Sequence, residues 1–137
     1  MRYGAIQTIG QTDARIPKLR TRDTASSLAI AGDRTITAAE ILGGIYVRDC
    51  AGASRADTLP TAALLVAAMK QPAIGDVITC RIINGSDAAE VLTLAAGAGG
   101  AFDVNQTAAS RIVPQNSSRL LDIRITGVQT PAYVAYL

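Results

Sequence analysis

Hydrophobic and polar residues alternate over much of the chain, and this two-residue period is typical of half-buried β-strands. The clearest alternation lies in Arg119–Thr126, in which Leu121, Ile123 and Ile125 fall on one face. The pattern therefore predicts a mainly β protein. Shorter or weaker strand patterns lie at Tyr3–Ile9, Arg34–Thr37, Gly44–Asp49, Val77–Ile83, Ala101–Val104, Arg111–Val113 and Ala132–Leu137.

The stretch Val77–Leu94 is predicted to form a β-hairpin. Its two runs of apolar and β-branched residues flank Asn84-Gly85-Ser86-Asp87, and Asn and Gly tolerate the positive φ that a tight reversal needs. In the first run Ile78 and Ile82 share a face, so we expect them to pack against the inward face of Arg119–Thr126.

One segment, near Thr61–Lys70, has the character of a helix. Lys70 lies at the end where the helix dipole favours a cation, and Pro72 stops the helix soon afterwards. Because nearly every position between is apolar, the helix is expected to be covered on most sides. A capping-box spacing occurs at Thr37–Glu40, but Gly43-Gly44 follows within a turn, so any helix there is expected to be very short.

Together these elements predict an antiparallel β-sandwich with one short inserted helix. A jelly-roll-like arrangement is preferred, although a barrel-like sandwich of another topology would give much the same pattern. The length of 137 residues supports one domain with a single core. We expect that domain to span residues 25–137, preceded by an extended N-terminal arm at residues 1–24.

The composition removes several classes of function. The chain has no histidine and no tryptophan, its aromatic content is 4%, and its net charge is +2. Histidine is the most common general base and a common ligand for zinc and iron. Few aromatic residues and a small net charge also speak against nucleic-acid binding. No apolar run is long enough to span a bilayer.

We therefore expect no enzyme activity, no catalytic, cofactor-binding or metal-binding residues, and no nucleic-acid or membrane partner. An enzymatic or ligand-binding jelly roll of the cupin type is the alternative, and it would usually need a histidine-rich metal site. The carboxylates are predicted to lie mostly at turns or on strand exteriors. Among them are Asp33, Glu40, Asp49, Asp57, Asp76, Glu90, Asp103 and Asp122.

The two cysteines are expected to remain free thiols. Cys80 lies on the apolar face of its predicted strand, whereas Cys50 is in phase with Tyr46 and Arg48 and opposite Ile45. Side chains on opposite strand faces do not readily pair, and a reducing compartment would keep both thiols reduced.

Basic residues are concentrated at the N-terminus. Five basic and two acidic side chains give residues 1–24 a charge of +3, whereas the remainder carries −1. Arginine suits bidentate pairing with carboxylates at an interface. The arm is therefore either an interaction segment or a solvated tail. Its basic residues are Arg2, Arg15, Lys18, Arg20 and Arg22.

A further set of turn and core patterns runs through residues 34–137. It comprises Gly44–Asp49, Ala51–Ala62, Gly75-Asp76, Ile82 with Asn84, Leu92–Gly99, Ser118-Arg119 and Val134–Tyr136. Together these segments resemble the small accessory capsid proteins of tailed bacteriophages, the decoration or cement proteins, and related phage head-fibre modules. The resemblance implies a jelly-roll-like sandwich that binds the outside of the major capsid shell, and it brings no catalytic or cofactor residues.

The expected function is that of a structural virion protein that cements neighbouring capsomers and stabilises the DNA-filled head. A head-fibre or receptor-binding adhesin module is the alternative. The expected partners are the major capsid protein and further copies of the chain, as a dimer or alternatively a trimer. No secretory signal is apparent, so we expect assembly in the host cytoplasm and a final place on the outer surface of the virion. The predicted interface residues are Arg2, Arg15, Lys18, Arg20, Arg22, Tyr133 and Tyr136.

Overall fold

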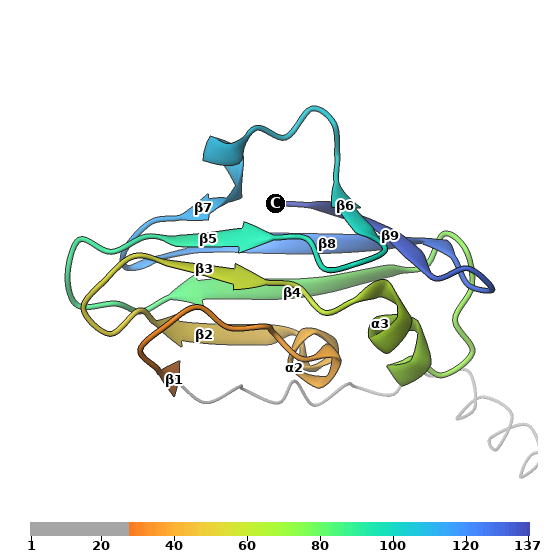
Figure 1. The fold of residues 1–137 in the computed structure, drawn as a ribbon, viewed down its shortest axis with the longest axis horizontal. Coiled ribbons are helices and arrows are strands. Elements are labelled where there is room, and N and C mark those ends of the chain that lie inside the picture. The colour runs from red at the N-terminus through yellow and green to blue at the C-terminus, as the bar shows by residue number, and fades with distance from the viewer. Residues whose placement is uncertain (1–27) are drawn as a thin grey trace, which may run out of the picture.

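Two β-sheets form the two main layers of the fold (Figure 1). The computed structural model describes residues 28–137, so the N-terminal arm predicted for residues 1–24 lies outside the described residues. The six-stranded sheet has the order β1 (Leu28–Ala29), β2 (Ile45–Asp49), β4 (Val77–Asn84), β8 (Ser117–Gly127), β9 (Ala132–Tyr136), β6 (Gly100–Phe102). The three-stranded sheet has the order β3 (Arg55–Thr58), β5 (Leu92–Ala95), β7 (Ile112–Val113).

Within residues 28–137, two short α-helices accompany the sheets. Helix α3 (Ala62–Ala68) begins at the N-cap Thr61 and confirms the helix predicted in this region. Helix α2 (Ala38–Gly43) uses the capping box noted in the sequence, in which the Glu40 amide donates to Thr37 Oγ1 over 3.2 Å. The prediction of a single helix is therefore wrong, because a complete capping box stabilises six residues whose Ile41 is buried in the core. A single 3₁₀ turn, η1 (Ala108–Arg111), precedes β7.

Helix α3 is covered on one face only, which corrects the expectation that most of its surface would be buried. Leu65 and Val66 lie in the core, whereas Leu64 on the opposite side is 59% exposed. The outward positions are otherwise alanines, whose small apolar surface costs little to leave in water. The apolar composition of α3 therefore does not require that every face of the helix is buried.

The sheets are mixed, which corrects the expectation of an antiparallel sandwich. Among the described strands, β1–β2, β2–β4, β3–β5 and β6–β9 are parallel pairs, whereas β4–β8, β8–β9 and β5–β7 are antiparallel. The fold is mainly β, with two sheets that are compatible with a β-sandwich. The alternation of polar and apolar residues identifies a strand but carries no information about the direction of its neighbour.

The predicted hairpin at Val77–Leu94 is not formed. Strand β4 pairs with β2 and β8, whereas β5 lies in the other sheet beside β3 and β7. Gly85 does not adopt a positive φ. Instead the Asn84 side chain accepts hydrogen bonds from the Ser86 amide and hydroxyl, and it donates to the Glu90 carbonyl. These contacts carry the chain from one sheet to the other in place of a tight reversal.

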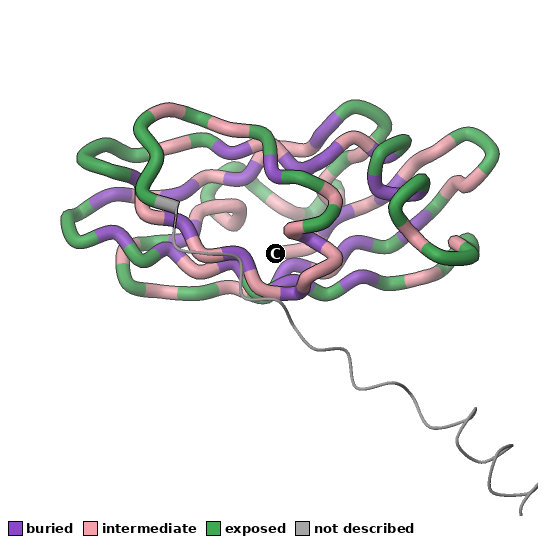
Figure 2. The backbone as a smooth tube through the Cα atoms, turned by 90° about the horizontal axis from the view of Figure 1, so that it is seen from below, coloured by how far each residue is buried: buried purple, intermediate pink, exposed green. Residues whose placement is uncertain are grey.

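The core lies between the layers, and its centre is the pairing of β4 with β8. Ile78 is opposite Ile123 in the register of these strands, and Cys80 is opposite Leu121. All four are buried, as are Ile82 and Ile125, which confirms the predicted cluster. Buried and exposed positions alternate along the strands (Figure 2).

Replacement of Ile123 by alanine is expected to lower the free energy of unfolding by about 2–5 kcal/mol, because it leaves a cavity in a fully buried site. Arg124→Ala, one residue along the strand on the exposed face, should cost less than about 0.5 kcal/mol. Denaturant titration of both variants measures the difference. Equal losses would mean that the two faces of β8 are wrongly assigned.

Candidate interaction surfaces

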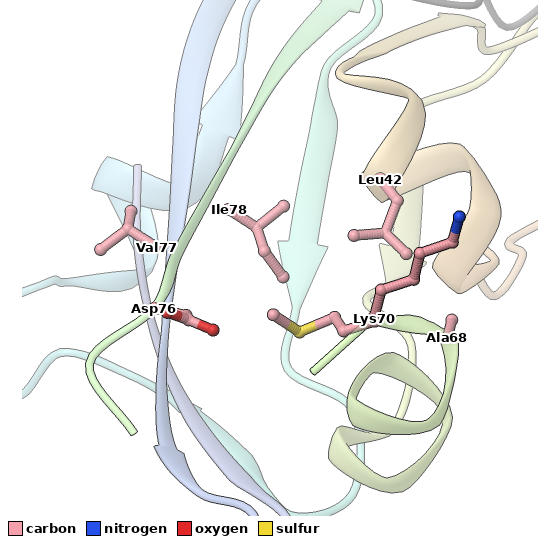
Figure 3. Close-up of a pocket in the computed structure, with 7 residues that line it drawn as sticks. Leu42, Ala68, Lys70, Asp76, Val77 and Ile78 are labelled. Carbon is pink, nitrogen blue, oxygen red and sulfur yellow. The ribbon is translucent and has the colours of Figure 1, made fainter. Parts of the chain in front are cut away.

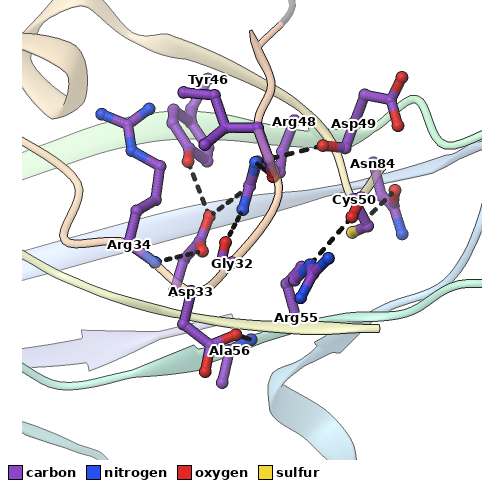
Figure 4. A network of polar contacts seen from close by, with 12 residues as sticks. Gly32, Asp33, Arg34, Tyr46, Arg48, Asp49, Cys50, Arg55, Ala56 and Asn84 are labelled. Atoms are coloured by element: carbon purple, nitrogen blue, oxygen red, sulfur yellow. Dashed lines mark hydrogen bonds and ion pairs between the residues drawn. The ribbon is translucent and has the colours of Figure 1, made fainter. Parts of the chain in front are cut away.

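A buried ion pair links the two sheets (Figure 4). Arg48 in β2 and Asp57 in β3 both have fully buried side chains, and Arg48 Nε lies 3.0 Å from Asp57 Oδ2. The Tyr46 hydroxyl donates to the same oxygen over 2.7 Å. Two neighbouring positions on the inward face of β2 thus bind one carboxylate from the opposite sheet.

The remaining polar groups of the pair bind the chain that precedes β2. Arg48 Nη1 donates to the Ile30 carbonyl over 2.7 Å, and Nη2 donates to the Gly32 carbonyl over 2.5 Å. The other oxygen of Asp57 accepts a hydrogen bond from the Arg34 amide over 3.1 Å. Because a buried charge is tolerated only with such partners, this network gives the pair a structural role.

This network corrects two expectations from the sequence. Asp57 was predicted to lie at a turn or on a strand exterior, and it is fully buried. On β2, Tyr46 and Arg48 point into the core, as does Cys50 directly after the strand, whereas Ile45 and Val47 point outward. Cys50 and Cys80 are therefore both buried, so the expectation that they lie on opposite faces is wrong, but neither forms a disulfide within residues 28–137.

A second buried polar group lies at the crossing from β4 to β5. Ser86 Oγ accepts a hydrogen bond from the Cys50 amide over 2.9 Å, and the Asn84 amide group donates to the Val113 carbonyl over 3.0 Å. Glu90 is 4% exposed, and its carboxylate oxygens have no hydrogen-bond partner among residues 28–137. No pattern in the sequence indicates that this carboxylate is buried.

Tyr133 was predicted to lie at an interface, and the structure places it in the core, 2% exposed. Its hydroxyl donates to the Pro60 carbonyl over 3.1 Å and accepts from the Gly97 amide over 3.0 Å. Its ring fills the space at which a Cβ on Gly100 would lie. The residue therefore ties β9 to the segments that follow β3 and β5 of the other sheet, and it offers no surface to a partner.

The other predicted interface residues divide into two groups. Tyr136 is half-buried, and the register of β9 with β8 places it opposite Asp122 on the outer face of the six-stranded sheet. The five basic residues of the arm lie outside the described residues. They are Arg2, Arg15, Lys18, Arg20 and Arg22.

The loop between α3 and β4 borders a hollow of about 490 Å³ (Figure 3). Leu42 of α2 and Ile78 of β4 point toward each other across it, with Lys70 and Asp76 at its margin. Val77 points to the opposite side of β4. The hollow therefore has an apolar floor and one charge of each sign nearby, which suits a polypeptide side chain better than a charged small molecule.

A second groove, of about 680 Å³, lies between this loop and the turn from β8 to β9. Pro72 and Ile74 line one side, and Val128 and Ala132 line the other. Ile74 is 71% exposed beside this groove. The α3–β4 loop is anchored to β8, since the Gly75 amide donates to the Ile125 carbonyl over 2.8 Å. We call this loop and its two hollows the loop end.

The part of the chain that the structure describes contains no group of three or more Cys, Asp or Glu side chains placed to hold a metal ion. Its helices are also too short to cross a membrane.

Comparison with known proteins returned no matching family model, no matching curated protein and no matching solved structure.

Asp57→Asn is expected to lower the free energy of unfolding by about 3–5 kcal/mol, because it leaves the buried Arg48 guanidinium without its counter-charge. Asp87→Asn makes the same chemical change at an exposed position and should have little effect. Thermal or denaturant unfolding compares the two variants. If both variants lose a similar free energy of unfolding, the structural role of the ion pair is contradicted.

Two buried tyrosines should make the protein sensitive to alkali. Burial and the hydrogen bond to Asp57 raise the pKa of Tyr46 above its ordinary value of about 10. Burial also raises the pKa of Tyr133, although its hydrogen bond from Gly97 acts in the opposite direction. Above pH 10 the unfolded chain loses tyrosine protons that the folded chain retains, so the free energy of unfolding should fall as pH rises.

The contribution of each tyrosine is measured by denaturant titration of the wild-type, Tyr46→Phe and Tyr133→Phe proteins between pH 8 and pH 11, roughly one unit or more on either side of the ordinary pKa. Each phenylalanine variant should lose stability less steeply above pH 10 than the wild type. The slopes should agree below the ordinary pKa, where tyrosine is protonated in both states. Equal slopes throughout would contradict the assignment.

Proposed function

We propose that this protein is a structural virion component, a cement protein that binds the outside of a bacteriophage major capsid shell and bridges neighbouring capsomers. The mainly β architecture and the resemblance of residues 34–137 to accessory capsid proteins support this function. The observation that carries it is the loop end, at which a large apolar side chain is held in the open beside a groove. Such a feature is typical of a protein–protein contact.

The loop end has the physical properties of a docking site. Burial of a side chain the size of Ile74 contributes about 1.5–3 kcal/mol to binding before the cost of association. Pro72, the turn at Gly75 and the hydrogen bond from Gly75 to Ile125 restrict the loop, which lowers the entropy lost on binding. A shell under internal pressure is strengthened by area buried across its seams, without chemistry.

The basic N-terminal arm would supply a second kind of contact. Its five basic residues suit carboxylates on the shell, and Ile6, Ile9, Ile16 and Leu19 give it apolar surface to bury. The electrostatic part of such binding weakens with salt, whereas the apolar part does not. Two types of contact therefore predict two different salt dependences.

The test mixes the purified protein with bare capsids that lack it and measures the bound fraction by sedimentation. Ile74→Asp should weaken binding by at least tenfold at all salt concentrations, because it places a charge where an apolar contact is proposed. Val104→Asp is the matched control, since Val104 is 96% exposed on the loop that follows β6. A protein lacking residues 1–24 should lose affinity mainly at low salt.

If Ile74→Asp binds capsids as tightly as Val104→Asp does, the loop end does not contact the capsid. Absence of capsid binding by the wild-type protein, together with binding to host cells, would replace the cement function with that of an adhesin.

A further inference from the structure

The outer face of the six-stranded sheet carries apolar side chains that nothing in residues 28–137 covers. The registers place Ile45 beside Arg81, and Arg81 beside Leu120, in one row across β2, β4 and β8. A second row runs from Val77 through Arg124 to Val134 on β9. The outward positions of these strands are all half-buried or exposed, and none is buried.

This face is more apolar than a solvated sheet face usually is. In a sandwich that is open to water on one side, outward positions are mostly polar. Here Leu120 is 45% exposed and Val77 is 58% exposed. Ile83 and Tyr136 are half-buried on the same face. Such a surface is an expected protein contact.

The charges on the face are balanced. Arg81 and Arg124 are matched by Asp49 and Asp122, so the formal charge of the outward positions on β2, β4, β8 and β9 is zero. A face that meets its own copy must avoid net repulsion and must offer both signs of charge. This face meets both conditions.

The outer face of the six-stranded sheet is also large enough for a dimer interface. The six strands contain 34 residues, and each covers about 3.3 by 4.8 Å of the sheet plane, which gives a footprint of roughly 540 Å². Stable interfaces begin at about 600 Å² per partner. Side-chain relief raises the accessible area above the flat footprint, so the face reaches the size that a dimer needs.

We propose that two copies of this chain pair through the outer faces of their six-stranded sheets about a two-fold axis. Sheets that pack face to face lie about 10 Å apart with their strands rotated by about 30° or 90°. The apolar rows of the two copies then interdigitate, and the arginines of one copy face the aspartates of the other. The loop end borders this face, because Ala132 lines its second groove and also lies at an outward position of β9.

The N-terminal arm is a poorer occupant of this face. Its charge of +3 gains nothing from a surface whose own charge is zero. A short segment would also cover only part of a six-stranded face. The pairing does not depend on a capsid, so it can fail or succeed independently of the cement function.

The test is sedimentation equilibrium of the full chain without capsids, over a hundredfold range of protein concentration. The wild type should show a monomer–dimer equilibrium. Leu120→Lys should raise the dimer dissociation constant by at least tenfold, because the two-fold axis brings the new cations close to each other and to Arg81. Leu64→Lys is the matched control, with 59% exposure on α3 in the other layer, and should dimerise as the wild type does.

Circular dichroism checks that each variant is folded. If Leu120→Lys does not fold, Val77→Lys is the second variant that tests the same face. A wild-type protein that is monomeric throughout, or trimeric, overturns the proposal. Dimerisation that appears only when residues 1–24 are removed also overturns the proposal, because the arm would then occupy the face in the full chain. Equal dimer affinity of the face variants and the control overturns it as well.

Discussion

The buried pair of Arg48 and Asp57 constrains the rest of the fold. It joins a strand of each sheet, and through Arg48 it also binds the carbonyls of Ile30 and Gly32. Such a pair adds less net stability than an apolar contact of the same volume would, because both charges lose their hydration. Its value lies in specificity, since any arrangement that separated the partners would leave a charge buried alone. The sheets are therefore held in one alignment.

The same pair determines which side chains of β2 lie on the outer face of the six-stranded sheet. Because Tyr46 and Arg48 must point inward to reach Asp57, the alternation along β2 turns Ile45 and Val47 outward. The apolar side chains that β2 contributes to the face proposed for dimerisation are thus a consequence of the polar contact in the core. The loop end is fixed separately, by the hydrogen bonds between residues 75–76 and β8.

The sequence alone determined the elements whose cause is local. The two-residue period of β8 identified its inward residues correctly, because Leu121, Ile123 and Ile125 alternate with polar neighbours. Thr61 and the apolar run after it located α3, and the capping box located the start of α2. Of the candidate site, the sequence indicated the basic arm, but Ile74 lies in a segment without any period and was not singled out.

Only the tertiary structure decided the features that depend on distant partners. The direction of the four parallel strand pairs, the separation of β4 from β5 and the inward face of β2 were predicted wrongly. A local pattern favours Ile45 over Arg48 as the inward residue, because it counts apolar surface and cannot include a carboxylate in another strand. Tyr133 is buried for the same reason, since its hydroxyl finds partners at Pro60 and Gly97, far away in the sequence. Burial of a polar side chain becomes favourable only when the folded chain supplies its hydrogen-bond partners.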